Sequence, residues 1–210
     1  MKPVNAIVLA AAFAMGTASA ATMNLQTMDY TRGADIYINA GGTVEMGFAG
    51  VMTGSIDGGS PFGLFCVDLF IFIDVPGTYD VNVLANTGVN NGANVGYLYT
   101  TYYNALTTPD DFAALQIAIW DVVHDNGDGI FSGSVQEDSA NPWSSTFRAR
   151  INQFISEGMA NVSSEGSVYE NVVGPNFAQT LFGLPAPEPS SFIMIGSGIG
   201  ALVMLRRRKA

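Results

Sequence analysis

Apolar and polar positions alternate through the first part of the chain, and the alternation indicates β-strands. Residues 23 to 58 alternate and are interrupted by Gly41-Gly42, a pattern typical of a hairpin. Residues 78 to 84 alternate in the same way. The segment from Phe62 to Ile73 is almost wholly apolar and rich in aromatic residues, which predicts a buried strand.

Apolar positions spaced by three or four residues predict three helices further along the chain. The strongest pattern runs from Pro109 to about His124, and Thr108 supplies an oxygen that can cap its first turn. A shorter pattern covers residues 95 to 106, and another follows Asn141-Pro142. The central helix buries the stripe formed by Phe112, Leu115, Ile119, Trp120 and Val123.

The order of these elements predicts one α+β domain. An antiparallel β-sheet or sandwich comes first, a helical lobe is inserted into it, and residues 161 to 186 form a final strand and a linker. Gln116 interrupts the apolar stripe of the central helix, four residues after Phe112 and four before Trp120. Because a buried unpaired amide costs about 1 to 3 kcal/mol, Gln116 needs hydrogen-bond partners or a covalent one.

Cys66 is the only cysteine, so an internal disulfide is excluded. It lies in the predicted apolar strand, two positions before Asp68, so both side chains should face the same side of that strand. Apolar surroundings raise the pKa of a thiol and slow its oxidation. A small buried core residue is one interpretation of Cys66, and a chemically committed sulfur is the other.

Both ends of the chain indicate export. Lys2 is followed by an apolar stretch and by Ala18-Ser19-Ala20, which together predict a signal peptide over residues 1 to 20. Pro187-Glu188-Pro189 precedes the uncharged run Phe192 to Leu205, and Arg206, Arg207, Arg208 and Lys209 follow it. This tail predicts a single transmembrane helix with the N-terminus outside and the cationic end in the cytoplasm.

The predicted ectodomain, residues 21 to 186, is strongly acidic. It contains three arginines, no lysine and all but one of the 18 acidic residues. Binding of nucleic acid or anionic lipid requires clustered cations, so this charge balance disfavours both. The balance suits an exported protein or one that meets cations.

The tail over residues 187 to 210 resembles the PEP-CTERM sorting signal of exopolysaccharide-producing Gram-negative bacteria. The resemblance rests on the motif Pro187-Glu188-Pro189, the apolar helix and the cluster Arg206, Arg207 and Arg208, in that order. It implies processing by an exosortase. It also implies a membrane-anchored intermediate that is later delivered to the cell surface or the extracellular matrix. An anchor that is never cut is the alternative.

Two segments of the ectodomain together resemble the Cys-Gln thioester domain family. They are Phe65-Cys66-Val67-Asp68 and Leu115-Gln116-Ile117-Ala118-Ile119-Trp120. The resemblance implies a bond between the sulfur of Cys66 and the side-chain carbonyl of Gln116, surrounded by Phe65, Asp68, Ile119 and Trp120. It also implies covalent attachment to an amine or hydroxyl on a protein or polysaccharide surface. The resulting prediction is a non-enzymatic surface adhesin without a cofactor.

Three alternatives stay open. Cys66 and Gln116 can be core residues of a structural exopolysaccharide or biofilm matrix protein that forms no thioester. An enzyme would pair Cys66 with His124, the only histidine, as nucleophile and base. Asp125, Asn126 and Asp128 offer oxygen ligands for calcium, but a helix-ending turn explains the same residues.

Overall fold

The computed structural model describes residues 19 to 172 and 179 to 184. The sorting motif, the predicted transmembrane helix and almost all of the predicted signal peptide lie outside these residues. Among the described residues, no helix is both long and apolar enough to span a bilayer.

Among the residues that the structure describes, six antiparallel strands pair in a closed ring. The long hairpin of β1 and β2 starts the ring, and β3, β7, β6 and β4 follow in that order, with β4 returning to the first half of β1. A short strand, β5, pairs with the far end of β1 outside this ring. The bounds are β1 Ser19–Ala40, β2 Thr43–Ile56, β3 Phe62–Cys66, β4 Gly77–Ala85, β5 Val135–Glu137, β6 Ser167–Asn171 and β7 Leu181–Gly183.

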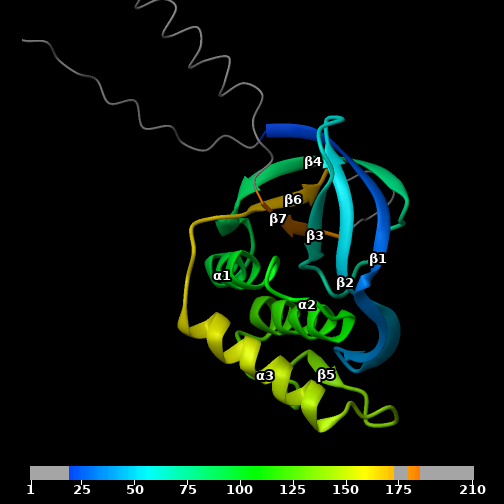
Figure 1. Cartoon of the computed structure of the whole chain (residues 1–210), viewed down its shortest axis with the longest axis vertical. Helices are drawn as coiled ribbons and strands as arrows, with labels where there is room; N and C mark the ends of the chain where they lie inside the picture. Colours follow the sequence, from blue (N-terminus) through cyan, green and yellow to red (C-terminus); the bar gives the residue numbers. More distant parts are fainter. Residues whose placement is uncertain (1–18, 173–178, 185–210) are drawn as a thin grey trace, which may run out of the picture.

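The three α-helices of the described segments lie together on one side of the strands (Figure 1). They are α1 Gly92–Tyr102, α2 Pro109–His124 and α3 Ser145–Ala160, with a 3-10 turn at Asn86–Gly88. Helix α2 is the central one, because it packs against β1 and β2 on one side and against α3 on the other. Its residues from Phe112 to Val123 are all buried, as expected for a helix enclosed by two layers.

The ring closes at β1, where Met23 to Leu25 pair with β2 on one edge and with β4 on the other. Strand β1 has 22 residues, and its pairing with β2 shifts register between Met28 and Gly33. At that irregularity the backbones approach closely: a Cβ on Gly50 would lie 2.4 Å from the Arg32 carbonyl oxygen. Only glycine fits there, and the local bend carries β1 from the ring toward the helices (Figure 1).

The predicted α+β class, the hairpin broken at Gly41-Gly42 and the three helices are confirmed. The sandwich alternative is wrong, since the strands form one sheet that closes on itself. The single strand predicted for residues 161 to 186 is two, β6 and β7.

The buried strand predicted for Phe62 to Ile73 is also wrong beyond its first five residues, since β3 ends at Cys66. Phe70 and Phe72 are 50% and 63% exposed, because the chain leaves the sheet at Val67 and crosses the surface as a loop.

Candidate functional site

Two elements meet at the site. Cys66 is the last residue of β3, where it pairs with Leu181 of β7, and Gln116 lies in the middle of α2. Helix α2 starts at the expected cap, where the Thr108 hydroxyl accepts a hydrogen bond from the Asp111 N–H, and this start fixes which residues face the strands. The two residues are separated by 50 positions in the sequence. The side chain of Gln116 and that of Cys66 are 1% and 3% exposed.

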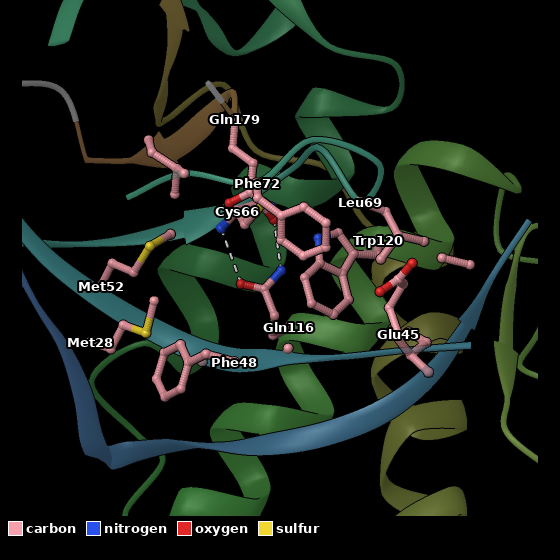
Figure 2. A pocket seen from close by; sticks show the side chains of 15 residues that line it. Met28, Glu45, Phe48, Met52, Cys66, Leu69, Phe72, Gln116, Trp120 and Gln179 are labelled. Atoms are coloured by element: carbon pink, nitrogen blue, oxygen red, sulfur yellow. Dashed lines mark hydrogen bonds between the residues drawn. The ribbon is translucent and has the colours of Figure 1, made fainter. Parts of the chain in front are cut away.

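The carboxamide of Gln116 forms two reciprocal hydrogen bonds with the backbone of Cys66 (Figure 2). The Cys66 N–H donates to Oε1 of Gln116 at 3.1 Å, and Nε2 of Gln116 donates to the Cys66 carbonyl oxygen at 2.7 Å. This pairing satisfies both ends of the buried amide. It also orients the amide relative to the backbone that carries the sulfur.

The pairing has a chemical consequence for the side-chain carbonyl of Gln116. A backbone N–H that points at Oε1 stabilises negative charge on that oxygen, which is where charge develops when a nucleophile attacks the carbonyl carbon. The nitrogen that would leave is held by a separate acceptor, the Cys66 carbonyl. The site therefore contains an electrophile whose oxygen has a donor already in place.

The thiol of Cys66 is buried, and its Sγ donates a hydrogen bond to the Asp68 carbonyl oxygen at 2.8 Å. Burial is the main reason why the pKa of this thiol is raised to about 12; the indole of Trp120 and the Asp68 carbonyl act to lower the pKa, and the Asp68 carboxylate acts to raise it. The Trp120 indole N–H is itself buried and has no hydrogen-bond partner among the described residues. The sulfur is consequently neutral near pH 7, which slows its oxidation.

A cavity of about 80 Å³ adjoins the pair and is lined by Cys66, Gln116 and Trp120 (Figure 2). One water takes about 10 to 15 Å³ in this measure, so the cavity accommodates several waters or the end of a thin aliphatic chain. Apolar side chains from β1, β2 and the loop after β3 form most of its wall: Met28, Phe48, Met52, Leu69 and Phe72. The polar side chains of Glu45 and Gln179 complete it.

Of the residues predicted to surround the thioester, only Trp120 lines this cavity. Trp120 lies at the cavity, whereas Phe65 and Ile119 are fully buried and do not line it. Phe65 instead packs edge to face against Tyr99, with ring centroids 5.9 Å apart. Adjacent residues of β3 point to opposite sides, which is why Cys66 and Phe65 separate.

Asp68 acts through its backbone, contrary to the prediction that its side chain shares a strand face with Cys66. Its carbonyl oxygen accepts from the thiol and from Nε2 of Gln179 at 3.0 Å. Its carboxylate accepts from the Phe70 N–H at 3.2 Å and so fixes the turn that follows β3. Since the strand ends at Cys66, strand alternation no longer places the next side chains.

His124 contacts the loop after β3. Its Nε2 is 3.0 Å from the Val67 carbonyl oxygen and 3.3 Å from the Leu69 nitrogen, and its ring packs edge to face against Phe70. Within the described part of the chain, the thiol donates its hydrogen bond to Asp68 and none to His124. In this arrangement His124 holds the loop in place, and a cysteine-histidine pair has no hydrogen bond to support it within the described residues.

Glu45, Phe72 and Gln179 are the site residues that the sequence did not indicate. Glu45 belongs to the exposed end of β2, Phe72 to the loop after β3, and Gln179 to the segment before β7. No spacing rule connects these three segments, because only the closed order of the strands brings them together. Phe72 gave no such signal either, because the apolar run that contains it predicts burial, whereas its side chain is 63% exposed.

The calcium candidates lie at the C-terminal end of α2, away from the cavity. Oδ1 of Asn126 accepts from the side-chain amides of Asn90 and Asn91, at 3.1 Å each, so its oxygen is already used. Carboxylate oxygens of Asp125 and Asp128 instead lie within 4.8 Å of each other and of an oxygen of Asp121.

Comparison with known proteins gives two distant structural likenesses. The N-terminal thioester domain of the fibronectin-binding protein SfbI from Streptococcus pyogenes is 11% identical over 78% of this chain and 98% of that one, with a TM-score of 0.43. The N-terminal domain of the Streptococcus pyogenes pilus tip adhesin Cpa is 12% identical over 77% and 98%, with a TM-score of 0.39. No protein family and no curated protein matches the sequence.

Proposed function

We propose that this chain is an exported surface protein that attaches covalently to its target through a thioester between Cys66 and Gln116. The observation that carries the proposal is the buried reciprocal pairing of the Gln116 carboxamide with the Cys66 backbone. A thioester requires the sulfur and the amide carbonyl to be neighbours, and this pairing holds the Gln116 amide against the residue that carries the sulfur.

Formation of the bond balances without a cofactor. The Cys66 sulfur attacks the side-chain carbonyl carbon of Gln116, a sulfur-carbon bond forms and the carbon-nitrogen bond breaks. The thiol proton leaves with the nitrogen as ammonia. The Cys66 N–H stabilises the oxyanion that develops at Oε1 in the tetrahedral intermediate.

Attachment then reverses the role of the sulfur. A nucleophile on the target attacks the same carbonyl carbon, the sulfur-carbon bond breaks and the proton of the nucleophile passes to the Cys66 thiolate. The high pKa of this buried thiol makes the sulfur a reluctant leaving group, which favours a long-lived bond. Apolar walls that limit water at the cavity support the same behaviour.

Glu45 favours an amine over a hydroxyl as the target group. It lines the cavity from the exposed end of β2, and its carboxylate attracts an ammonium group. The described residues contain no lysine, so no lysine amine from that part of the chain competes for the acyl group.

Export, exosortase processing of the Pro187-Glu188-Pro189 tail and delivery to the cell surface or matrix are part of the same proposal. Their support is the sequence pattern of the two ends. Sorting is tested separately, by following the size and location of the protein in cells that lack the processing enzyme.

The test of the thioester is the intact mass of the protein, purified without reductant, beside a Cys66→Ala control. The proposal predicts a wild-type mass lower than calculated by one ammonia, and an adduct at Gln116 after methylamine treatment. Glu45→Gln should slow amine uptake and leave the mass loss unchanged. A full calculated mass, with an unmodified Gln116 in the peptide map, would refute the covalent proposal.

A non-covalent matrix protein is the second candidate, and a specific observation favours it. The hydrogen bonds of Gln116 already satisfy the buried amide, so the fold is stable in principle without the bond. The same mass measurement separates the two candidates.

A further inference from the structure

We propose that Asp121, Asp125 and Asp128 form a calcium site at the C-terminal end of α2. The three residues each offer a carboxylate oxygen, and these oxygens all lie within 4.8 Å of one another. Two ligands held about 2.4 Å from one Ca²⁺ are at most about 4.8 Å apart, so these separations are compatible with ligands of a single ion. The proposal is independent of whether the thioester forms.

Asp121 provides the observation that points to a ligand. It is 0% exposed, its Oδ2 accepts from the Gly129 N–H at 3.1 Å, and its Oδ1 has no hydrogen-bond partner among the described residues. Buried carboxylate oxygens without partners are rare because losing their hydration is costly. A cation in the cluster would supply the missing partner.

The cluster lacks a positive charge from the described part of the chain. The arginines there are used elsewhere: Arg148 pairs with Glu137, Arg150 pairs with Asp111, and Arg32 lies over the Tyr103 ring. The helix adds to the imbalance, because the C-terminal end of α2 carries partial negative charge.

The surrounding backbone holds the second ligand in position. Oδ2 of Asp125 accepts from the N–H groups of Ser134 and Val135, at 2.8 and 2.7 Å. Gly133 has a φ of +75°, and a Cβ there would lie 2.4 Å from the Asp125 carboxylate carbon. The loop therefore closes over Asp125 in a way that permits no side chain at Gly133.

The composition of the cluster selects calcium among the common cations. All three side chains supply carboxylate oxygens, which suit hard cations, whereas zinc sites use cysteine or histidine. Three carboxylates on a turn give calcium the anionic ligands it favours, and backbone oxygens or waters can complete six to eight ligands. Magnesium more often retains several waters and one or two carboxylates.

The experiment uses the full chain in detergent, which is treated with EDTA and then titrated with Ca²⁺ or Mg²⁺. The heat of binding and the thermal unfolding of the protein are recorded. One Ca²⁺ should bind per chain. At a Ca²⁺ concentration 100 times the Kd, the ratio of folded to unfolded protein should rise about 100-fold. A smaller response to Mg²⁺ is expected.

Three variants complete the test. Asp121→Asn and the exposed Asp128→Asn should each lower calcium affinity at least about tenfold, since each removes a charged ligand. Asp110→Asn removes an exposed charge at the other end of α2 and should bind calcium as the wild type does. Absence of calcium binding by the wild type, equal binding by Asp128→Asn, or a stronger response to Mg²⁺ would overturn the proposal.

Discussion

Two buried polar side chains on one helix differ in whether the rest of the fold provides their hydrogen-bond partners. Gln116 and Asp121 both belong to α2, and they are 1% and 0% exposed. The backbone of Cys66 satisfies both ends of the Gln116 amide, while Asp121 retains one oxygen without a partner. A neutral amide can be satisfied by backbone groups alone, whereas crowded carboxylates are stabilised by a cation or by a proton. Helix α2 therefore combines one site that the chain itself completes with the site proposed here for calcium.

The largest effect should come from removing the amide. Gln116→Leu leaves the N–H and carbonyl of Cys66 buried without partners, so the free energy of unfolding should fall by about 2 to 6 kcal/mol. Loss of the cross-link adds to this fall wherever the thioester has formed. Urea unfolding measures the change, and Gln153→Leu on the exposed face of α3 is the matched control. A fall below about 1 kcal/mol would show that the pairing contributes little.

The next largest effect is the protection of the thiol against alkylation. It is measured in the Gln116→Leu protein, because that protein cannot form the thioester. A pKa raised from 9.0 to about 12 lowers the thiolate fraction at pH 8 about 1000-fold, so iodoacetamide should label the folded protein far more slowly than the unfolded one. Cys66→Ser gives the background rate of labelling. Equal labelling rates in folded and unfolded protein would contradict the burial of the sulfur.

The same shift predicts the pH dependence of stability. The folded state holds the thiol proton more tightly than the unfolded state, so this contribution is constant below about pH 9 and is lost as pH rises toward about 12. Urea unfolding of the Gln116→Leu protein, with Cys66→Ser in the same background as control, measures the change.

A smaller effect distinguishes Asp125, which holds the loop before β5, from the exposed Asp128. In EDTA, Asp125→Ala should lower the free energy of unfolding by about 2 to 4 kcal/mol, because it removes two charge-assisted hydrogen bonds to the loop before β5. Asp128→Ala should change it by less than about 0.5 kcal/mol, as expected of an exposed residue. If the two variants lose the same stability in EDTA, the loop is not held by Asp125.

The smallest effect concerns Trp120. Its indole lowers the pKa of the Cys66 thiol, so Trp120→Phe in the Gln116→Leu background should slow iodoacetamide labelling, by less than about tenfold since contacts to sulfur are weak. Trp143→Phe, the other tryptophan, should leave the rate unchanged. Faster labelling after Trp120→Phe would mean that the indole acts mainly by covering the sulfur.

Local patterns predicted the helices well and the end of β3 poorly. The Thr108 cap and the apolar repeat define α2 from Pro109 to His124, and both signals lie within the helix itself. Phe70 and Phe72 resemble strand residues but are exposed, because the chain leaves the sheet after Cys66 to contact His124. A run of apolar residues does not reveal where its strand loses its partner.

The sequence by itself determined the α+β class, the face of α2 that contains Gln116, and the shortage of positive charge. Each depends on residues close together in the chain or on composition. The tertiary structure alone decided that six strands close into a ring and that Glu45, Phe72 and Gln179 line a cavity beside Cys66. It also brought the carboxylate of Asp121 close to those of Asp125 and Asp128. The physical reason is that strand pairing and helix packing join distant residues, and neither leaves a periodic signal in the sequence.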